Sequence, residues 1–253
     1  MRSVSFGHRP AVLGAIITTL LFIPTVTSAF QLVPMSAVIE TDAPSPVEVF
    51  SINNTTPEAI AIQLRTVTRE ILPDGTEVNN DAREQLQVFP SQLIVPPGTT
   101  QTVRVRWTGA TVPDRELPFR LVAEQLPINL DRETEDNSGV RFMLRYRATV
   151  YVRPPDTAPE ITVLDVATDP EAETVTITVE NRGSRHQSFP EGRIALTATG
   201  GSAADDGGEV ILPISGIEAF IPVNLLAGST RRVVIPLEQL PFAPEEVRFL
   251  FDR

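Results

Sequence analysis

A long alternating segment in the middle of the chain restricts the possible folds more than any other feature. In GVRFMLRYRATVYVRP, residues 139–154, apolar residues occupy every second position from Val140 to Val152. Successive side chains of a β-strand point to opposite sides, so this pattern predicts one strand with an apolar face. Its thirteen residues would span about 40 Å, whereas most strands have five or six residues. The other face carries four arginines: Arg141, Arg145, Arg147 and Arg153.

Strand patterns also fill the rest of the chain. Short alternating segments rich in Val, Ile, Thr and Phe are separated by Pro, Gly and Asn, which is typical of β-structure. Seven of these segments, from a first strand at Phe30 to Ile39 to the strand at Val140 to Val152, predict an antiparallel Ig-like β-sandwich of about 120 residues. A further set from Ile161 to Phe251 predicts a second, smaller sandwich.

The segment RPPDTAP, residues 153–159, divides the two sets of strands. Proline cannot donate a hydrogen bond within a sheet, so we expect this stretch to connect two domains. The predicted fold is therefore all-β, with two Ig-like β-sandwich domains. We assign residues 30–153 to the N-terminal domain, 154–159 to the linker and 160–253 to the C-terminal domain.

The first 29 residues have the order of a secretory signal peptide. Arg2 and Arg9 precede an apolar run from Ala11 to Ile23, and small residues end the segment at Ala29. The run is shorter than the roughly 20 residues that span a membrane, which favours cleavage over anchoring. We therefore expect an exported chain that is not inserted in the membrane after cleavage.

The charge balance limits the possible partners. The formal net charge is −11, and removing the two positive charges of Arg2 and Arg9 gives −13 for the expected mature chain. A strongly negative protein is poorly suited to bind nucleic acid or an anionic membrane surface. All 21 basic residues are arginine, so any basic site must be built from guanidinium groups.

Few residues of the expected mature chain could support catalysis. It has no cysteine and only one histidine, His186, which we interpret as a surface-loop residue. Nucleophilic catalysis needs a base beside a serine or cysteine, and zinc sites need clustered Cys and His. Acidic pairs such as Asp205 and Asp206 lack the spacing of a calcium loop. The sequence therefore favours a binding protein without a metal or other cofactor over an enzyme.

The long strand suggests a protein partner. An exposed apolar strand edge favours aggregation unless a partner pairs with it. The acidic segment DRETEDNSG, residues 131–139, suggests that Val140, Phe142 and Leu144 extend beyond fixed neighbours. A partner could pair with this strand through backbone hydrogen bonds and accept alternate side chains in its pockets. The alternative is a strand that runs the whole sheet and is buried along its length.

Several segments of the first predicted domain resemble PapD-like periplasmic pilus chaperones. They occur in the order found in that family and cover nearly all of the domain. The second domain resembles the family less, through VENRG (179–183) and VNLLAGSTRRV (223–233). The segments of the first domain, besides the long strand, are FQLVPMSAVIE (30–40), VFSINNTTPEAIAIQLRTV (49–67), VFPSQLIVPPGTTQTVRVRW (88–107) and DRELPFRLVAEQLP (114–127).

The resemblance implies a boomerang of two Ig-like domains that acts in the periplasm during fimbrial assembly. Such chaperones lend alternating residues of one strand to a pilus or fimbrial subunit that lacks its last strand. They then deliver the subunit to an outer-membrane usher. In this chain the lent residues would be Val140, Phe142, Leu144 and Tyr146. The alternative function is that of a structural or adhesive two-domain Ig-like protein of the cell surface, and a glycan-acting enzyme comes third.

The resemblance also implies an ion pair between the two domains. Glu116 and Arg153 would match the pair that fixes the domains in family members. In those members an acid of the second domain joins the pair, and this acid cannot be placed in the sequence.

The expected anchor for the subunit departs from the family pattern. Family members bind the subunit's C-terminal carboxylate with two basic residues, but the corresponding positions hold Ala37 and Thr149. Arg145 or Arg147, on the same parity as Thr149, is the expected replacement, because an arginine fork binds a carboxylate well. Alternatively, these arginines only cover the sheet with their aliphatic stems. The departure suggests a divergent branch of the family, of the archaic type.

Overall fold

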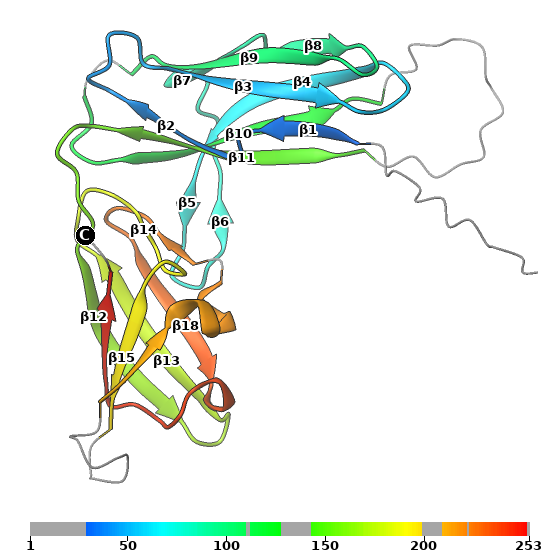
Figure 1. Cartoon of the computed structure of the whole chain (residues 1–253). Coiled ribbons are helices and arrows are strands. Elements are labelled where there is room, and N and C mark those ends of the chain that lie inside the picture. The colour runs from blue at the N-terminus through cyan, green and yellow to red at the C-terminus, as the bar shows by residue number, and fades with distance from the viewer. Residues whose placement is uncertain (1–28, 110–111, 128–142, 199–208, 222, 252–253) are drawn as a thin grey trace, which may run out of the picture.

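The structure is a computed structural model that describes residues 29–109, 112–127, 143–198, 209–221 and 223–251 (Figure 1). Residues 1–28 of the predicted signal peptide, and Val140 and Phe142 of the long strand, lie outside these ranges. Within them, helical structure is limited to three short 3-10 turns at Ile214–Gly216, Glu218–Phe220 and Leu237–Gln239. The prediction of an all-β protein is confirmed.

Two sheets face each other in the first domain. Their inner faces supply one hydrophobic core, in which Phe50, Ile52, Leu121 and Val150 are fully buried. The first sheet has the order β1 (Phe30–Val33), β3 (Val47–Asn54), β9 (Thr100–Trp107), β7 (Leu86–Phe89). The second sheet has the order β2 (Ser36–Glu40), β11 (Arg145–Arg153), β10 (Leu117–Gln125), β4 (Ile60–Thr68), β8 (Gln92–Val95).

The first strand differs from the prediction, because the expected strand from Phe30 to Ile39 is two strands in different sheets. β1 pairs antiparallel with β3, whereas β2 pairs parallel with β11. The break falls at Pro34, which has no N–H to continue a ladder of hydrogen bonds. The chain therefore crosses from one sheet to the other and places β2 beside the C-terminal half of β11.

A second hydrophobic core begins after the proline-rich segment. Phe189 lies at its centre, stacked on Phe220 and in edge contact with Phe249. One sheet has the order β12 (Ile161–Asp169), β13 (Thr174–Asn181), β18 (Thr230–Pro236), and another has the order β16 (Glu209–Pro213), β15 (Arg193–Thr197), β19 (Glu246–Leu250). β14 (Gln187–Ser188) pairs with β17 (Asn224–Leu225). The second sandwich of the predicted fold is thus confirmed.

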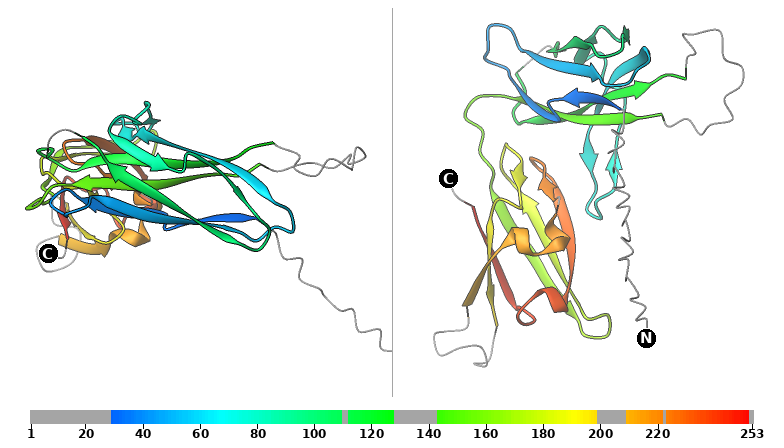
Figure 2. Two further views of the ribbon diagram at one scale, coloured as in Figure 1. Left: turned by 90° about the horizontal axis from the view of Figure 1, so that it is seen from above. Right: turned by 45° about the vertical axis from the view of Figure 1, so that its right-hand side comes forward.

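The two domains form the arms of a boomerang, and a β-hairpin projects into the angle between them (Figures 1 and 2). The hairpin consists of β5 (Glu70–Ile71) and β6 (Glu77–Val78), which pair only with each other. Its turn touches the second domain, where the Arg232 N–H donates to the Pro73 carbonyl at 2.8 Å. Glu77 is the first residue of β6 in this hairpin.

Candidate functional site

β11 has one open edge in its N-terminal half. β10 pairs with β11 from Arg145 to Val152, but β2 covers only Thr149 to Arg153 on the other side. No described strand pairs with the residues from Arg145 to Ala148 on that second side. This stretch of β11 can therefore accept a further strand.

The hydrogen bonds around this edge show which backbone groups face it. The Gln125 N–H donates to the Leu144 carbonyl at 3.0 Å, so the backbone groups of Leu144 face β10. The Thr149 N–H donates to the Met35 carbonyl at 2.9 Å, on the opposite side of the strand. Neighbouring residues of a strand bond to opposite sides. The backbone groups of Arg145 and Arg147 therefore share the orientation of Thr149 and face the open edge.

The alternate side chains of this edge face the core of the first domain. Ala148 is fully buried, whereas Leu144 and Tyr146 are partly buried against the core. The Tyr146 ring contacts Phe30 edge-on, with ring centroids 4.8 Å apart. Among the residues predicted to be lent, Leu144 and Tyr146 thus pack against the edge of the core of the first domain. β11 begins at Arg145, so the described strand is shorter than the predicted one.

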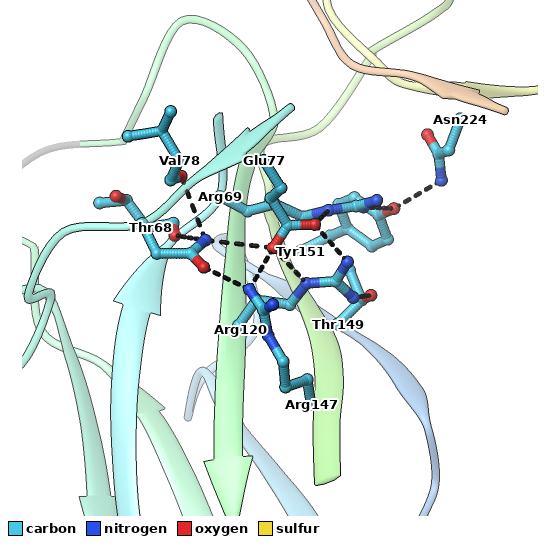
Figure 3. A network of polar contacts seen from close by, with 10 residues as sticks. Thr68, Arg69, Glu77, Val78, Arg120, Arg147, Thr149, Tyr151 and Asn224 are labelled. Atoms are coloured by element: carbon cyan, nitrogen blue, oxygen red, sulfur yellow. Dashed lines mark hydrogen bonds and ion pairs between the residues drawn. The ribbon is translucent and has the colours of Figure 1, made fainter. Parts of the chain in front are cut away.

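Beside the open edge, an arginine cluster surrounds one carboxylate (Figure 3). We use this name for Arg69, Arg120 and Arg147 around Glu77. Arg120 forms two bonds, from Nε to Oε1 at 3.0 Å and from Nη2 to Oε2 at 2.6 Å. Arg147 Nη2 lies 2.6 Å from Oε1, and Arg69 Nε lies 3.2 Å from Oε2. Both oxygens of Glu77 therefore contact two guanidinium groups each.

These contacts keep Glu77 ionised in a partly buried position. Burial by itself raises the pKa of Glu77, but hydrogen bonds from Arg120 and Asn79 and the charges of Arg120 and Arg69 lower it to about 2. The Glu77 side chain is 19% exposed, and those of Arg69 and Arg120 are 10% and 17% exposed. Arg147 is the accessible member of the cluster, with 43% of its side chain exposed.

The two arginines predicted as carboxylate anchors lie in different surroundings. Arg147 joins the cluster and also donates to Asn79, whereas Arg145 pairs with Glu124 on the neighbouring strand. Thr149, at one of the expected basic positions, accepts a hydrogen bond from Arg120 Nη1 at 2.6 Å. A guanidinium group therefore reaches this position from β10. Sequence analysis missed Arg120, because no local pattern tells which residue of another strand lies opposite Thr149.

A second carboxylate, Glu116, connects the two domains. It is almost fully buried and accepts a hydrogen bond from Arg153 Nε at 2.8 Å. His186 of the second domain contacts it with Nδ1 at 2.5 Å and donates its backbone N–H at 3.1 Å. Burial raises the pKa of Glu116, but the bonds and charge of His186 and the bond from Arg153 outweigh it and leave the pKa lowered.

The interpretation of His186 as a surface-loop residue is wrong. Its side chain is 18% exposed, and its ring stacks on Tyr151 of β11 with centroids 4.0 Å apart. A histidine thus stands where the resemblance led us to look for an acid. Nothing in the run NRGSRHQS around His186 signals this, because the contact depends on how the domains meet.

Tyr151 joins the two carboxylate sites. Its hydroxyl accepts a hydrogen bond from Arg69 Nη1 at 3.1 Å and one from Asn224 Nδ2 of the second domain at 2.8 Å. Arg69 belongs to the arginine cluster, and the Tyr151 ring contacts His186. A continuous chain of polar contacts therefore runs from Glu77 to the domain interface (Figure 3).

The described part of the chain holds no group of three or more Cys, His, Asp or Glu residues placed to bind a metal ion. Within the same ranges, no helix has the length and apolar character needed to cross a membrane. The features that stand out are the open edge of β11 and the arginine cluster beside it.

Solved structures of fimbrial chaperones share this fold. The class 5 fimbriae chaperone CfaA gives a TM-score of 0.58 at 14% identity, over 89% of this chain and 92% of that one. A chain of the CsuC–CsuE chaperone–tip subunit pre-assembly complex from the archaic Csu pili of Acinetobacter baumannii gives 0.55 at 14% identity, over 89% and 100%. A chain of the Salmonella enterica SafA pilin–SafB chaperone complex gives 0.55 at 12% identity, over 84% and 86%.

Sequence comparison gives the family. No curated protein matches the chain. Residues 31–158, however, match the family described as "Pili and flagellar-assembly chaperone, PapD N-terminal domain". The matched residues include both the open edge of β11 and the arginine cluster. The chain belongs to the PapD-like family of pilus and fimbrial assembly chaperones.

Proposed function

We propose that this protein is a periplasmic chaperone that binds a fimbrial subunit along the open edge of β11 and delivers it to an outer-membrane usher. The observation that carries the proposal is the stretch from Arg145 to Ala148, which pairs with β10 on one side and has no described strand on the other. A subunit that lacks a strand could complete its fold there by backbone pairing. The signal peptide predicted for residues 1–29 agrees with a place in the periplasm.

Two sets of side chains would hold the subunit. Val140, Phe142, Leu144 and Tyr146 would enter its groove as the lent residues. Each buried apolar side chain of this size contributes on the order of 1.5 to 3 kcal/mol before the entropy of association is subtracted. Arg147 would bind the subunit's C-terminal carboxylate, supported by Arg120, whereas Arg145 lies outside the cluster and would contribute less.

Co-expression with the products of neighbouring genes tests the proposal. The protein is expected to co-purify in a one-to-one complex with a small subunit that is unstable alone. Leu144→Arg places a charge among the lent residues and is expected to lower the yield of the complex at least tenfold, because an unpaired charge is costly to bury.

The matched control is Leu164→Arg. Leu164 is an exposed leucine of β12 in the second domain, whereas the open edge belongs to the first. Capture is expected to be unchanged in this variant. Equal capture by Leu144→Arg and Leu164→Arg would remove the lent-strand assignment. Retention of the protein on washed cells or in isolated fimbriae would instead support the surface-protein alternative.

A further inference from the structure

Glu77 occupies the arginine cluster in the manner of a bound ligand. Its two oxygens receive four contacts from three guanidinium groups, at distances from 2.6 to 3.2 Å. The three arginines come from separate parts of the first domain: Arg69 follows β4, Arg120 lies on β10 and Arg147 lies on β11. A carboxylate held by paired guanidinium donors is the arrangement expected for carboxylate recognition.

The hairpin that carries Glu77 lies outside both sheets of the first domain. β5 and β6 form a two-stranded sheet of their own, and neither strand contributes a residue to the hydrophobic core. Glu77 therefore reaches the cluster from a hairpin that is not part of either sheet. Its side chain makes polar contacts there with the three arginines and Asn79.

The three arginines differ in how firmly they are held. Arg69 also donates to Tyr151, and Arg120 also donates to Thr149, and both side chains are largely buried. Arg147 is 43% exposed, and its partners besides Glu77 are limited, among the described residues, to Asn79 of the same hairpin. Arg147 is therefore the arginine that can turn from Glu77 to an external carboxylate.

The charge balance allows such an exchange. Three guanidinium groups and one carboxylate leave the cluster with two excess positive charges. If Arg147 moves to an external carboxylate, Glu77 keeps Arg69 and Arg120 and stays neutralised. The exchange replaces one arginine–carboxylate pair by another, so its direction depends on how strongly Glu77 and Asn79 hold Arg147.

We propose that Glu77 is a resident competitor for the subunit anchor: it holds Arg147 in the unbound protein, and the terminal carboxylate of a bound subunit must take Arg147 from it. The ligand class is a peptide C-terminal carboxylate, and a carboxamide is not a substitute. This inference rests on the proposed function. Glu77 then determines how much the bond between Arg147 and the subunit's carboxylate adds to the affinity that pairing along β11 provides.

Two synthetic peptides test this competition. One is an acetylated hexapeptide of alternating Val and Thr with a free C-terminal carboxylate, and the other is the same peptide ending in a carboxamide. Calorimetry measures the affinity of both for the wild-type protein and for Glu77→Gln. The variant is expected to bind the acid peptide about fivefold more tightly, the scale of one partly exposed ion pair, and the amide peptide equally well. Adding Arg147→Gln to Glu77→Gln is expected to remove the gain.

The control for net charge is Asp81→Asn. Asp81 pairs with Arg83, and the pair is mostly exposed outside the cluster. This change removes the same charge and is expected to leave both peptide affinities unchanged. Asn79→Asp works in the opposite direction, because it adds a second resident carboxylate beside Arg147, although it also removes the hydrogen bonds that Asn79 Nδ2 donates to Glu77 Oε1 and to the Thr68 carbonyl. It is expected to weaken binding of the acid peptide alone, and it provides a test if Glu77→Gln fails to fold.

Three results would overturn the proposed competition. The first is an equal change in affinity for both peptides on going from the wild-type protein to Glu77→Gln. The others are weaker binding of the acid peptide by Glu77→Gln and no detectable binding of that peptide by this variant. None of them decides the proposed function, because capture of the whole subunit is measured separately with Leu144→Arg. Conversely, failure of subunit capture would remove the proposed function, whatever the peptides show.

Discussion

Glu77 and Glu116 are both acidic residues of the first domain held by arginine, but their surroundings differ. Glu116 is 1% exposed and is enclosed by Arg153 and by His186 of the second domain. Glu77 is 19% exposed, and one of its partners, Arg147, lies open to solvent. The chain thus contains one carboxylate–arginine site that is closed to solvent, at Glu116, and one that is partly open, at Glu77.

The difference separates a permanent contact from an exchangeable one. A buried carboxylate that loses a partner leaves an uncompensated charge, so the Glu116 site is suited to hold the domains in one arrangement. An ion pair that is open on one side can be replaced by water or by a ligand at small cost. The Glu77 site is therefore suited to exchange partners, and Tyr151 links it to the closed site.

The largest effect is expected when each carboxylate is removed. Glu116→Ala should lower the free energy of unfolding by about 3 to 5 kcal/mol, because Arg153 and His186 lose a buried partner. Glu77→Ala should cost about 1 to 3 kcal/mol, since Arg147 can be hydrated. Urea unfolding followed by circular dichroism measures both values.

Fluorescence of Trp107, the chain's one tryptophan, then reports on the first domain separately. Glu116→Ala is expected to separate the fluorescence transition from the circular dichroism transition, because the buried contact through which Glu116 joins Arg153 to His186 of the second domain is lost. Glu77→Ala should keep the two transitions together. Glu124→Ala, which removes only the exposed pair with Arg145, is the control and should cost less than about 1 kcal/mol. If Glu77→Ala were as costly as Glu116→Ala, the distinction between the two sites would fail.

A smaller effect is expected in acid. The pKa of Glu77 is about 2 in the folded protein against an ordinary value of 4.5. A lowered carboxyl pKa stabilises the fold fully above the ordinary value, and this stabilisation is lost as the pH falls from 4.5 toward 2. After allowance for partial exposure, the loss amounts to on the order of 2 kcal/mol.

Urea unfolding of the wild-type protein and Glu77→Gln at several pH values between 2 and 7 measures this loss. Stability should fall less steeply below pH 4.5 in Glu77→Gln than in the wild-type protein. Part of the slope should remain, because the pKa of Glu116 is also lowered. Identical slopes in the two proteins would contradict the strong hold of the cluster on Glu77.

The sequence predicted the core-facing side of β11, because the alternation of a strand is a local property: Ala148, Val150 and Val152 are fully buried, as their parity predicts. It did not predict that Thr149 and Tyr151 on the opposite face are buried as well, because Arg120 and the second domain contact that face. Local patterns were less informative about strand ends. The break at Pro34 was missed, although proline is a direct signal against a continuous strand.

The site was only partly predictable, because its members come from distant parts of the chain. Arg147 was singled out from its own strand, but Glu77 and Arg120 were not, since their approach depends on strand order and on the β5–β6 hairpin. The position of His186 depends on how two domains meet. Single-sequence patterns contain neither strand order nor domain contacts.

The smallest expected effect concerns the turn that holds the β5–β6 hairpin against the second domain. Gly75 has a φ of +94°, and an added Cβ would lie 1.8 Å from Arg231 Nη1 of that domain. Gly98 has a φ of +66° with nothing within 4 Å, so it is a matched control for backbone strain. Alanine at either position should cost about 1 kcal/mol for the left-handed backbone.

Gly75→Ala should cost about 0.5 kcal/mol more than Gly98→Ala, because the Arg231 guanidinium can move aside only by giving up its place beside the turn. Urea unfolding of both variants measures the difference in the free energy of unfolding. Equal costs would mean that the Arg231 side chain does not hold the turn of the hairpin against the second domain in solution. Glu77 would then reach the arginine cluster from a loosely placed hairpin, and the open site would be still easier to exchange than its comparison with Glu116 indicates.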